Sequence, residues 1–195
     1  MKRLLLPLAL AVTASPAVAH LDPGTHGSFV AGMSHPAFGL DHVLAIVAVG
    51  LWAGMMAGRA RWAVPSAFVA LMVLGFGLSV AGLPLPLVEP MIVASVVVVG
   101  LLVAAAVRLD PRLATALVGL FAVFHGHAHG SELGQAGALG FGLGFLIATA
   151  ALQGAGIALA LLAERAAEKL GGVAPGLVRG AGGLTALAGI GLLVS

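Results

Sequence analysis

Six apolar segments, each near the length needed to cross a lipid bilayer, recur along this chain of 195 residues. A transmembrane helix needs about 20 apolar residues, and the connections between the segments are rich in charge, proline or glycine, as turns between helices are. With 61% hydrophobic and 8% charged residues, the composition excludes an ordinary soluble domain. The sequence therefore predicts an all-α integral membrane bundle of six transmembrane helices, at 38–57, 63–82, 90–107, 113–127, 135–163 and 175–194.

The N-terminal 19 residues have the pattern of a secretory signal peptide. Lys2 and Arg3 precede a short apolar stretch, and residues 17–19 read Ala-Val-Ala. A basic start, a short apolar run and small residues at the cleavage point are the three parts of such a signal. We therefore expect a cleaved signal peptide at 1–19 and a single six-helix transmembrane domain at 20–195.

Lysine and arginine are confined to alternate connections, and this bias predicts the topology. Loops rich in these residues stay in the cytoplasm, so the intervening connections and the C-terminus are expected to face outward. Cleavage of a signal peptide predicts the same exterior position for the mature N-terminus. The basic side chains after residue 19 are Arg59, Arg61, Arg108, Arg112, Arg165, Lys169 and Arg179.

The residue types exclude several classes of function. Cysteine is absent, which excludes disulfides, thiolate metal sites and cysteine nucleophiles and leaves nitrogen and oxygen as metal ligands. The few basic residues are scattered between apolar runs, so there is no surface for nucleic acid. No Walker A motif is present, so transport by this chain alone would be passive or coupled to an ion gradient.

A first polar cluster leads into the first apolar segment. His35 is followed by Pro36 and Gly39, which predict a turn or a broken helix start, and Asp41 and His42 are expected in the first helical turn. One explanation for an acid at this position is that it caps the start of the helix and has no other role. Because Asp and His together at membrane depth are costly unless they are paired or functional, we favour metal binding.

A second polar cluster ends the fourth apolar segment. If the helix continues, His125, His129 and Glu132 have i, i+4 and i+7 spacing and share one face, whereas His127 points to the opposite side. Two imidazoles one turn apart with a carboxylate beyond them can converge on a cation. We therefore include all four residues among the candidate metal ligands.

Four further residues are weaker candidates, two as metal ligands and two as polar groups along a transport path. Cleavage before His20 would create a free α-amino group next to an imidazole, and His26 follows closely in the same exterior segment. Thr149 and Gln153 are one helical turn apart in the fifth segment and could supply oxygen atoms along an inward path. Hydrogen bonding between helices explains these two polar side chains equally well.

Imidazole and carboxylate ligands without thiolates suit nickel, cobalt, zinc or copper(II), and they disfavour magnesium and calcium, which prefer oxygen alone. These residue types do not select one metal among the four. They are also compatible with an intramembrane zinc-dependent hydrolase, or with a membrane subunit that senses or delivers metal.

The two clusters resemble those of the HupE/UreJ family of hydrogenase and urease accessory membrane proteins, which are considered nickel permeases. The resemblance covers essentially the whole chain. Its specific parts are the pattern His35-Pro36, Gly39, Asp41-His42 with Val49-Gly50-Leu51-Trp52-Ala53, and the pattern Phe124-His125-Gly126, Ala128-His129-Gly130 with Glu132.

The resemblance implies a secondary permease and not an enzyme, with 20–195 as its transporter domain in the bacterial cytoplasmic membrane and both mature termini in the periplasm. The cargo would be nickel, with cobalt, copper or zinc as alternatives, and no prosthetic group is expected. The residues that it carries over are His35, Asp41, His42, His125, His129 and Glu132. The expected partners are the metal ion and the lipid bilayer, without nucleic acid, and a homo-oligomer is left open.

Overall fold

A computed structural model describes residues 28–170 and 174–194, and within these ranges every regular element is a helix. The predicted signal peptide at 1–19, His20 and His26 lie outside the described residues. The elements in chain order are α2 (Ser28–Ser34), the 3₁₀ helix η1 (His35–Phe38), α3 (Leu40–Gly54), α4 (Ala60–Val80), α5 (Val88–Ala104), α6 (Pro111–Ser131), α7 (Ala138–Leu170) and α8 (Ala174–Leu193).

Each of the six predicted segments holds one helix, α3 to α8, but not every helix is a candidate span by its own length and composition. Helices α4, α7 and α8 are long and apolar enough to cross a membrane, and α2 to α3 form a fourth candidate if the bent pair is one span. Helix α5 is apolar but has only 17 residues, and α6 carries three histidines near its end. The six-span arrangement stays a prediction.

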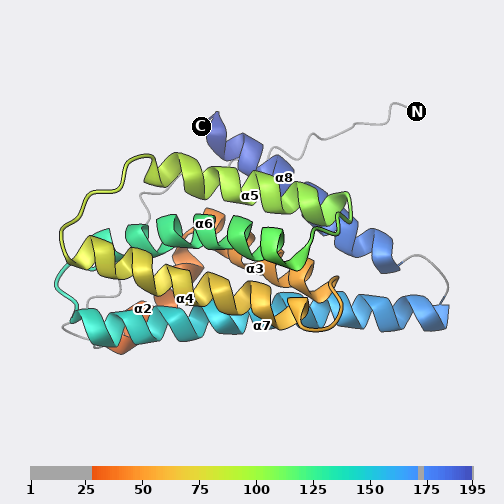
Figure 1. Cartoon of the computed structure of the whole chain (residues 1–195), viewed down its shortest axis with the longest axis horizontal. Helices are drawn as coiled ribbons and strands as arrows, with labels where there is room; N and C mark the ends of the chain where they lie inside the picture. Colours follow the sequence, from red (N-terminus) through yellow and green to blue (C-terminus); the bar gives the residue numbers. More distant parts are fainter. Residues whose placement is uncertain (1–27, 171–173, 195) are drawn as a thin grey trace, which may run out of the picture.

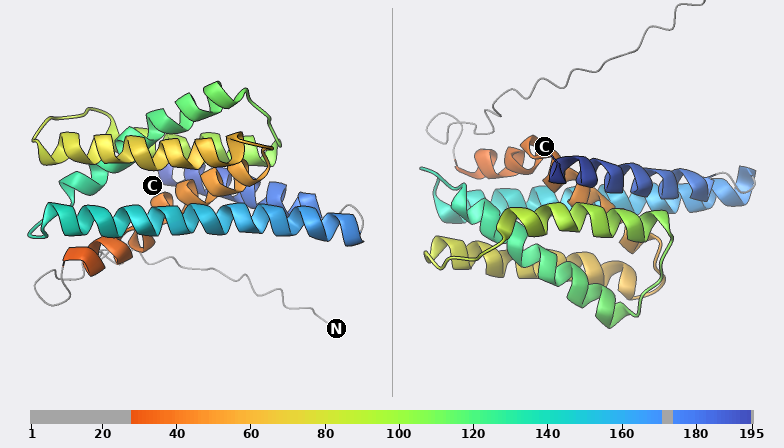
Figure 2. Two further views of the ribbon diagram at one scale, coloured as in Figure 1. Left: turned by 60° about the horizontal axis from the view of Figure 1, so that its bottom comes forward. Right: turned by 90° about the horizontal axis from the view of Figure 1, so that it is seen from above.

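The break predicted at the start of the first segment is confirmed. Pro36 lies in the first turn of η1, where the missing N–H of proline is tolerated. Gly39 is extended, with φ −99° and ψ 110°, and it separates η1 from α3. The two arms are bent by 84°. The short helix α2 before this break was not predicted, and it lies against α7 in both views of Figure 2.

Successive helices from α3 to α8 run in alternate directions along the bundle (Figure 1). The connections α3–α4 and α5–α6 therefore lie at one end, together with the end of α7 and the start of α8. All the basic residues that predicted the topology belong to this end, which we call the basic end. The ends of α4 and α6 and the start of α7 lie at the opposite end, which we call the histidine end.

Glycine allows helices α4 and α6 to lie in direct backbone contact. A Cβ atom added at Gly126 of α6 would collide with the backbone of Met72 and Phe76 in α4, and one added at Gly75 of α4 would collide with the backbone of Val123. Small residues at a crossing permit such close approach between helices. This contact fixes the position of α6, which carries three of the described histidines.

We expect Gly126→Ala to force α4 and α6 apart, because the atoms in the way are backbone and cannot rotate aside. Overpacking of this kind costs about 1–3 kcal/mol, and the melting temperature of the purified protein in detergent should fall. Gly77→Ala is the matched control, because a Cβ at Gly77 meets nothing within 4 Å. Equal melting temperatures for the two variants would contradict this account of the crossing.

Candidate metal site

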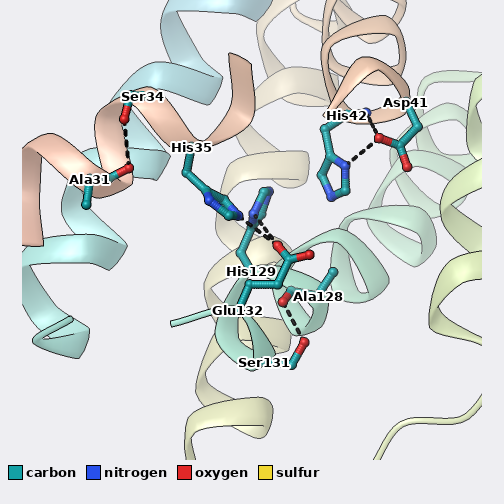
Figure 3. Close-up of polar contacts among 9 residues, drawn as sticks. All are labelled: Ala31, Ser34, His35, Asp41, His42, Ala128, His129, Ser131 and Glu132. Atoms are coloured by element: carbon teal, nitrogen blue, oxygen red, sulfur yellow. Dashed lines mark hydrogen bonds and ion pairs between the residues drawn. The ribbon is translucent and has the colours of Figure 1, made fainter. Parts of the chain in front are cut away.

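The two polar clusters predicted from the sequence meet at the histidine end of the bundle (Figure 3). His35 of η1 and Glu132 at the end of α6 are 97 positions apart in sequence, yet His35 Nε2 lies 2.7 Å from Glu132 Oε2. The ring of His129 lies against His35, with ring centroids 5.0 Å apart. Two remote segments thus form one polar group inside an apolar bundle.

His35, His129 and Glu132 form the capture group, which has the composition of a divalent metal site. One ligand atom from each of the three residues lies within 4.8 Å of the other two. Both imidazoles are buried, whereas the Glu132 side chain is 42% exposed. Imidazole nitrogen with a carboxylate oxygen is a ligand set for nickel, cobalt, zinc or copper. The exposed carboxylate leaves the capture group accessible from the histidine end.

Helix α6 supplies two members of the capture group because it continues to Ser131, four residues beyond the predicted end of the fourth segment, so the condition for a shared face is met. The N–H of Glu132 donates to Ala128 O at 3.1 Å, so the helical course extends to this carboxylate. His127 lies apart from the capture group, because a residue two positions from both 125 and 129 projects from the other side of a helix. Its Nε2 instead lies 3.0 Å from Leu83 O.

Asp41 orients the imidazole of His42. Its Oδ1 accepts hydrogen bonds from the backbone N–H of His42 at 2.8 Å and from His42 Nδ1 at 2.9 Å. In a neutral imidazole, a proton on Nδ1 leaves the lone pair on Nε2. This Nε2 is buried and has no hydrogen-bond partner among the described residues. A carboxylate that fixes a histidine tautomer in this way is a common support for a metal ligand.

His42 extends the capture group toward the interior of the bundle. Its ring lies beside that of His129, with centroids 4.7 Å apart, and edge-on to that of His125, with centroids 5.0 Å apart. His125 is completely buried and also contacts Phe68. All six residues that the resemblance carried over therefore lie in one continuous cluster.

Two phenylalanines of α7 that the sequence analysis did not single out cover this cluster. Phe141 lies 5.1 Å from His35 and Phe145 lies 4.8 Å from His129, between ring centroids. Their i, i+4 spacing was visible in the sequence, but it is equally typical of core packing. They exclude water from one side of the imidazoles, which strengthens electrostatic interactions there.

Thr149 and Gln153 continue the same face of α7 toward the basic end, because each is one turn beyond the residue before it in the series Phe145, Thr149, Gln153. Both are buried, at 0% and 2% exposure. Thr149 Oγ1 and Gln153 Nε2 have no hydrogen-bond partner within the described part of the chain. Buried polar atoms without partners are costly, so this stripe is a candidate continuation of the site.

Comparisons with known proteins agree with the resemblance seen in the two motifs. The family model described as HupE / UreJ protein matches residues 8–192. The chain is 45% identical to Protein HupE of Rhizobium leguminosarum bv. viciae over 196 aligned positions, which cover all of both proteins. No solved structure matches the chain. Because the family model and this relative both match along nearly the whole length, a stretch that contains both histidine motifs of this chain, the chain belongs to the HupE/UreJ family.

Proposed function

We propose that this protein is a secondary permease that imports a divalent transition metal ion, with nickel as the preferred cargo, from the periplasm into the cytoplasm. The observation that carries the proposal is the capture group of His35, His129 and Glu132, whose ligand atoms lie within 4.8 Å of one another. Ionisable side chains in an apolar helical bundle are costly unless they are paired or functional, and the ligand set of this group suits a divalent transition metal.

The choice of metal rests on two arguments of different kinds. Imidazole and carboxylate ligands without cysteine favour nickel, cobalt, zinc and copper(II) over magnesium and calcium. Affinity order alone would favour copper over nickel. Nickel is preferred because of the family resemblance.

The direction of transport rests on the separation of charge between the two ends of the bundle. Basic connections remain in the cytoplasm, and every connection with such residues belongs to the basic end. The capture group lies at the histidine end, which would then face the periplasm. Its accessible member is Glu132, with a side chain 42% exposed.

The proposed route runs from the capture group toward the middle of α7. Glu132 and His35 replace part of the hydration shell of the ion, His129 and His42 take it inward, and Thr149 and Gln153 offer oxygen atoms further along. A carrier must release its ion, so binding has to be favourable for capture and weak enough for departure. Flux would follow the metal gradient or be coupled to another ion.

The test is uptake of nickel, cobalt, zinc and copper into metal-depleted proteoliposomes that contain the purified protein. We expect flux of one metal to dominate and Glu132→Gln to slow it, because the amide removes the charge of the only exposed carboxylate in the capture group. Glu164→Gln is the matched control, since Glu164 is an exposed acid near the basic end. Tight binding without flux would instead support a zinc hydrolase or a metal-sensing subunit.

A further inference from the structure

A cavity of about 560 Å³ lies at the basic end of the bundle, opposite to the capture group. Its walls come from the end of α3, the connection between α5 and α6, the last turns of α7 and the start of α8, which Figure 1 shows together at this end. The volume is within the range of about 300–1,000 Å³ that is typical of small-molecule sites. None of its lining residues belongs to the capture group or to the proposed route of the ion, so the cavity is a candidate site for a separate ligand.

The charged side chains that line this cavity are separated by sign. The connection between α5 and α6 supplies Arg108 and α8 supplies Arg179, whereas α7 supplies Glu164 and Glu168. All four residues are exposed. In the described part of the chain, no ion pair within 4.0 Å joins one of these arginines to one of these glutamates. The cavity therefore has a positive wall and a negative wall, an arrangement that suits a ligand with both charges.

Two hydrogen bonds hold the positive wall in place. Trp52 Nε1 donates to Val107 O at 2.8 Å, which fixes the connection that carries Arg108. Arg179 Nε donates to Ala104 O, also at 2.8 Å. A guanidinium has five N–H donors, and this bond uses only the one nearest the main chain. The terminal nitrogen atoms of Arg179 have no hydrogen-bond partner among the described residues, so they are available to the oxygen atoms of a phosphate.

The α3 side of the cavity and the surface beside the cavity are apolar. Trp52, Met55 and Met56 line the α3 side. Leu162 of α7 and Leu177 of α8 directly precede lining residues, and they are 57% and 70% exposed. In a helical bundle within a bilayer, exposed leucines of this kind contact acyl chains. A ligand with a charged headgroup and apolar chains therefore fits this place better than a soluble ion does.

Helix α7 places the cavity at the level of lipid headgroups. Its 33 residues extend about 50 Å at about 1.5 Å per residue, whereas the hydrocarbon core of a bilayer is about 30 Å thick. Figure 1 shows that α7 extends past the other helices at the basic end. Glu168 lies one turn nearer this end than Glu164, about 6 Å further along the axis. Glu168 is thus the carboxylate closer to the outermost group of a lipid headgroup.

We propose that this cavity binds the headgroup of a phospholipid that carries a primary amine. Arg108 and Arg179 hold its phosphate, and Glu168 holds its ammonium group, which is the outermost group of such a lipid. Arginine binds phosphate through strong charge-assisted hydrogen bonds, and basic pockets between transmembrane helices bind lipid headgroups. This site is separate from metal transport and does not depend on the proposed function.

The negative wall determines which phospholipid is preferred. A headgroup without a cationic group, as in phosphatidylglycerol, leaves Glu168 without a partner and adds repulsion between its carboxylate and the phosphate. The quaternary ammonium of phosphatidylcholine has no N–H to donate to a carboxylate. Phosphatidylethanolamine has both a phosphate and an ammonium group with three N–H donors, so it should bind most tightly.

The proposal is tested by native mass spectrometry of the purified full-length protein, stripped of lipid and then titrated separately with the dioleoyl forms of these three phospholipids. We expect the highest affinity for phosphatidylethanolamine. Arg179→Gln should lower this affinity about 10- to 100-fold, which corresponds to the loss of a hydrogen bond to a charged group. The matched control is Arg112→Gln, because Arg112 is exposed at the same end but does not line the cavity. This control should keep the wild-type affinity.

Glu168→Gln decides the proposal if Arg179→Gln does not fold. Loss of the carboxylate should weaken the binding of phosphatidylethanolamine and remove the repulsion of phosphatidylglycerol, so the preference between these two lipids should disappear. Equal affinities of the wild-type protein for all three lipids, or an unchanged preference in Glu168→Gln, would overturn the site. Equally tight binding of soluble glycerophosphoethanolamine, which has no acyl chains, would overturn the assignment to a lipid.

Discussion

Replacement of His129 by alanine is expected to abolish metal uptake. His129 contributes to the capture group, and its ring lies 4.7 Å from that of His42 at the start of the inward route. Removal of an outer-shell partner of a metal ligand costs about 10- to 100-fold, so removal of a proposed ligand itself should reduce the initial rate by more than about 100-fold. The measurement is nickel uptake into proteoliposomes matched for protein content.

His127→Ala separates this effect from damage to helix α6. His127 lies on the same helix two residues earlier, and its Nε2 contacts Leu83 O instead of the capture group. Both variants lose one imidazole near the histidine end, but only His129→Ala removes a proposed ligand. We expect His127→Ala to retain most of the uptake. An equal loss of uptake in both variants would show that this part of α6 does not tolerate replacement of a histidine side chain by alanine. It would then give no support for His129 as a ligand.

Local patterns in the sequence were sufficient to place helices α3 to α8 to within a few residues and to predict which residues of the second polar cluster share a helix face. The break at Pro36 and Gly39 follows from the backbone preferences of these two residues. The common face of His125, His129 and Glu132 follows from helical periodicity alone. The opposite position of His127 follows from the same periodicity. Each of these predictions depends on residues close together in the chain, and the structure confirms them.

The contacts between segments could not be predicted, because no local preference encodes them. Nothing near Ser95 indicates that its hydroxyl meets His125, 30 positions away. The pairing of His35 with Glu132 likewise depends on how α2 and η1 pack against α7. The aromatic cover from Phe141 and Phe145 has the same spacing as ordinary core residues. The number of spans also depends on tertiary arrangement, since α2 and α3 are bent by 84° and α5 is short.

Asp41→Asn is expected to reduce metal uptake about 10- to 100-fold, the range for loss of a partner that orients a metal ligand. Asparagine is nearly the same size and can still accept the hydrogen bond from the backbone N–H of His42. It lacks the negative charge that favours a proton on His42 Nδ1 and thereby a lone pair on Nε2. The expected loss of uptake therefore comes from the altered proton position on His42. It does not come from damage to the first turn of helix α3. The measurement is the initial rate of nickel uptake.

Asp110→Asn is the matched control for this substitution. Asp110 also begins a helix, and its Oδ1 accepts a hydrogen bond from the backbone N–H of Arg112 at 2.9 Å, but it lies at the basic end. Asparagine and aspartate cap helices about equally well, so uptake should remain near the wild-type rate in this variant. If Asp41→Asn also transports at the wild-type rate, the charge on Asp41 does not support His42 as a ligand. The role of Asp41 would then be restricted to the first turn of α3.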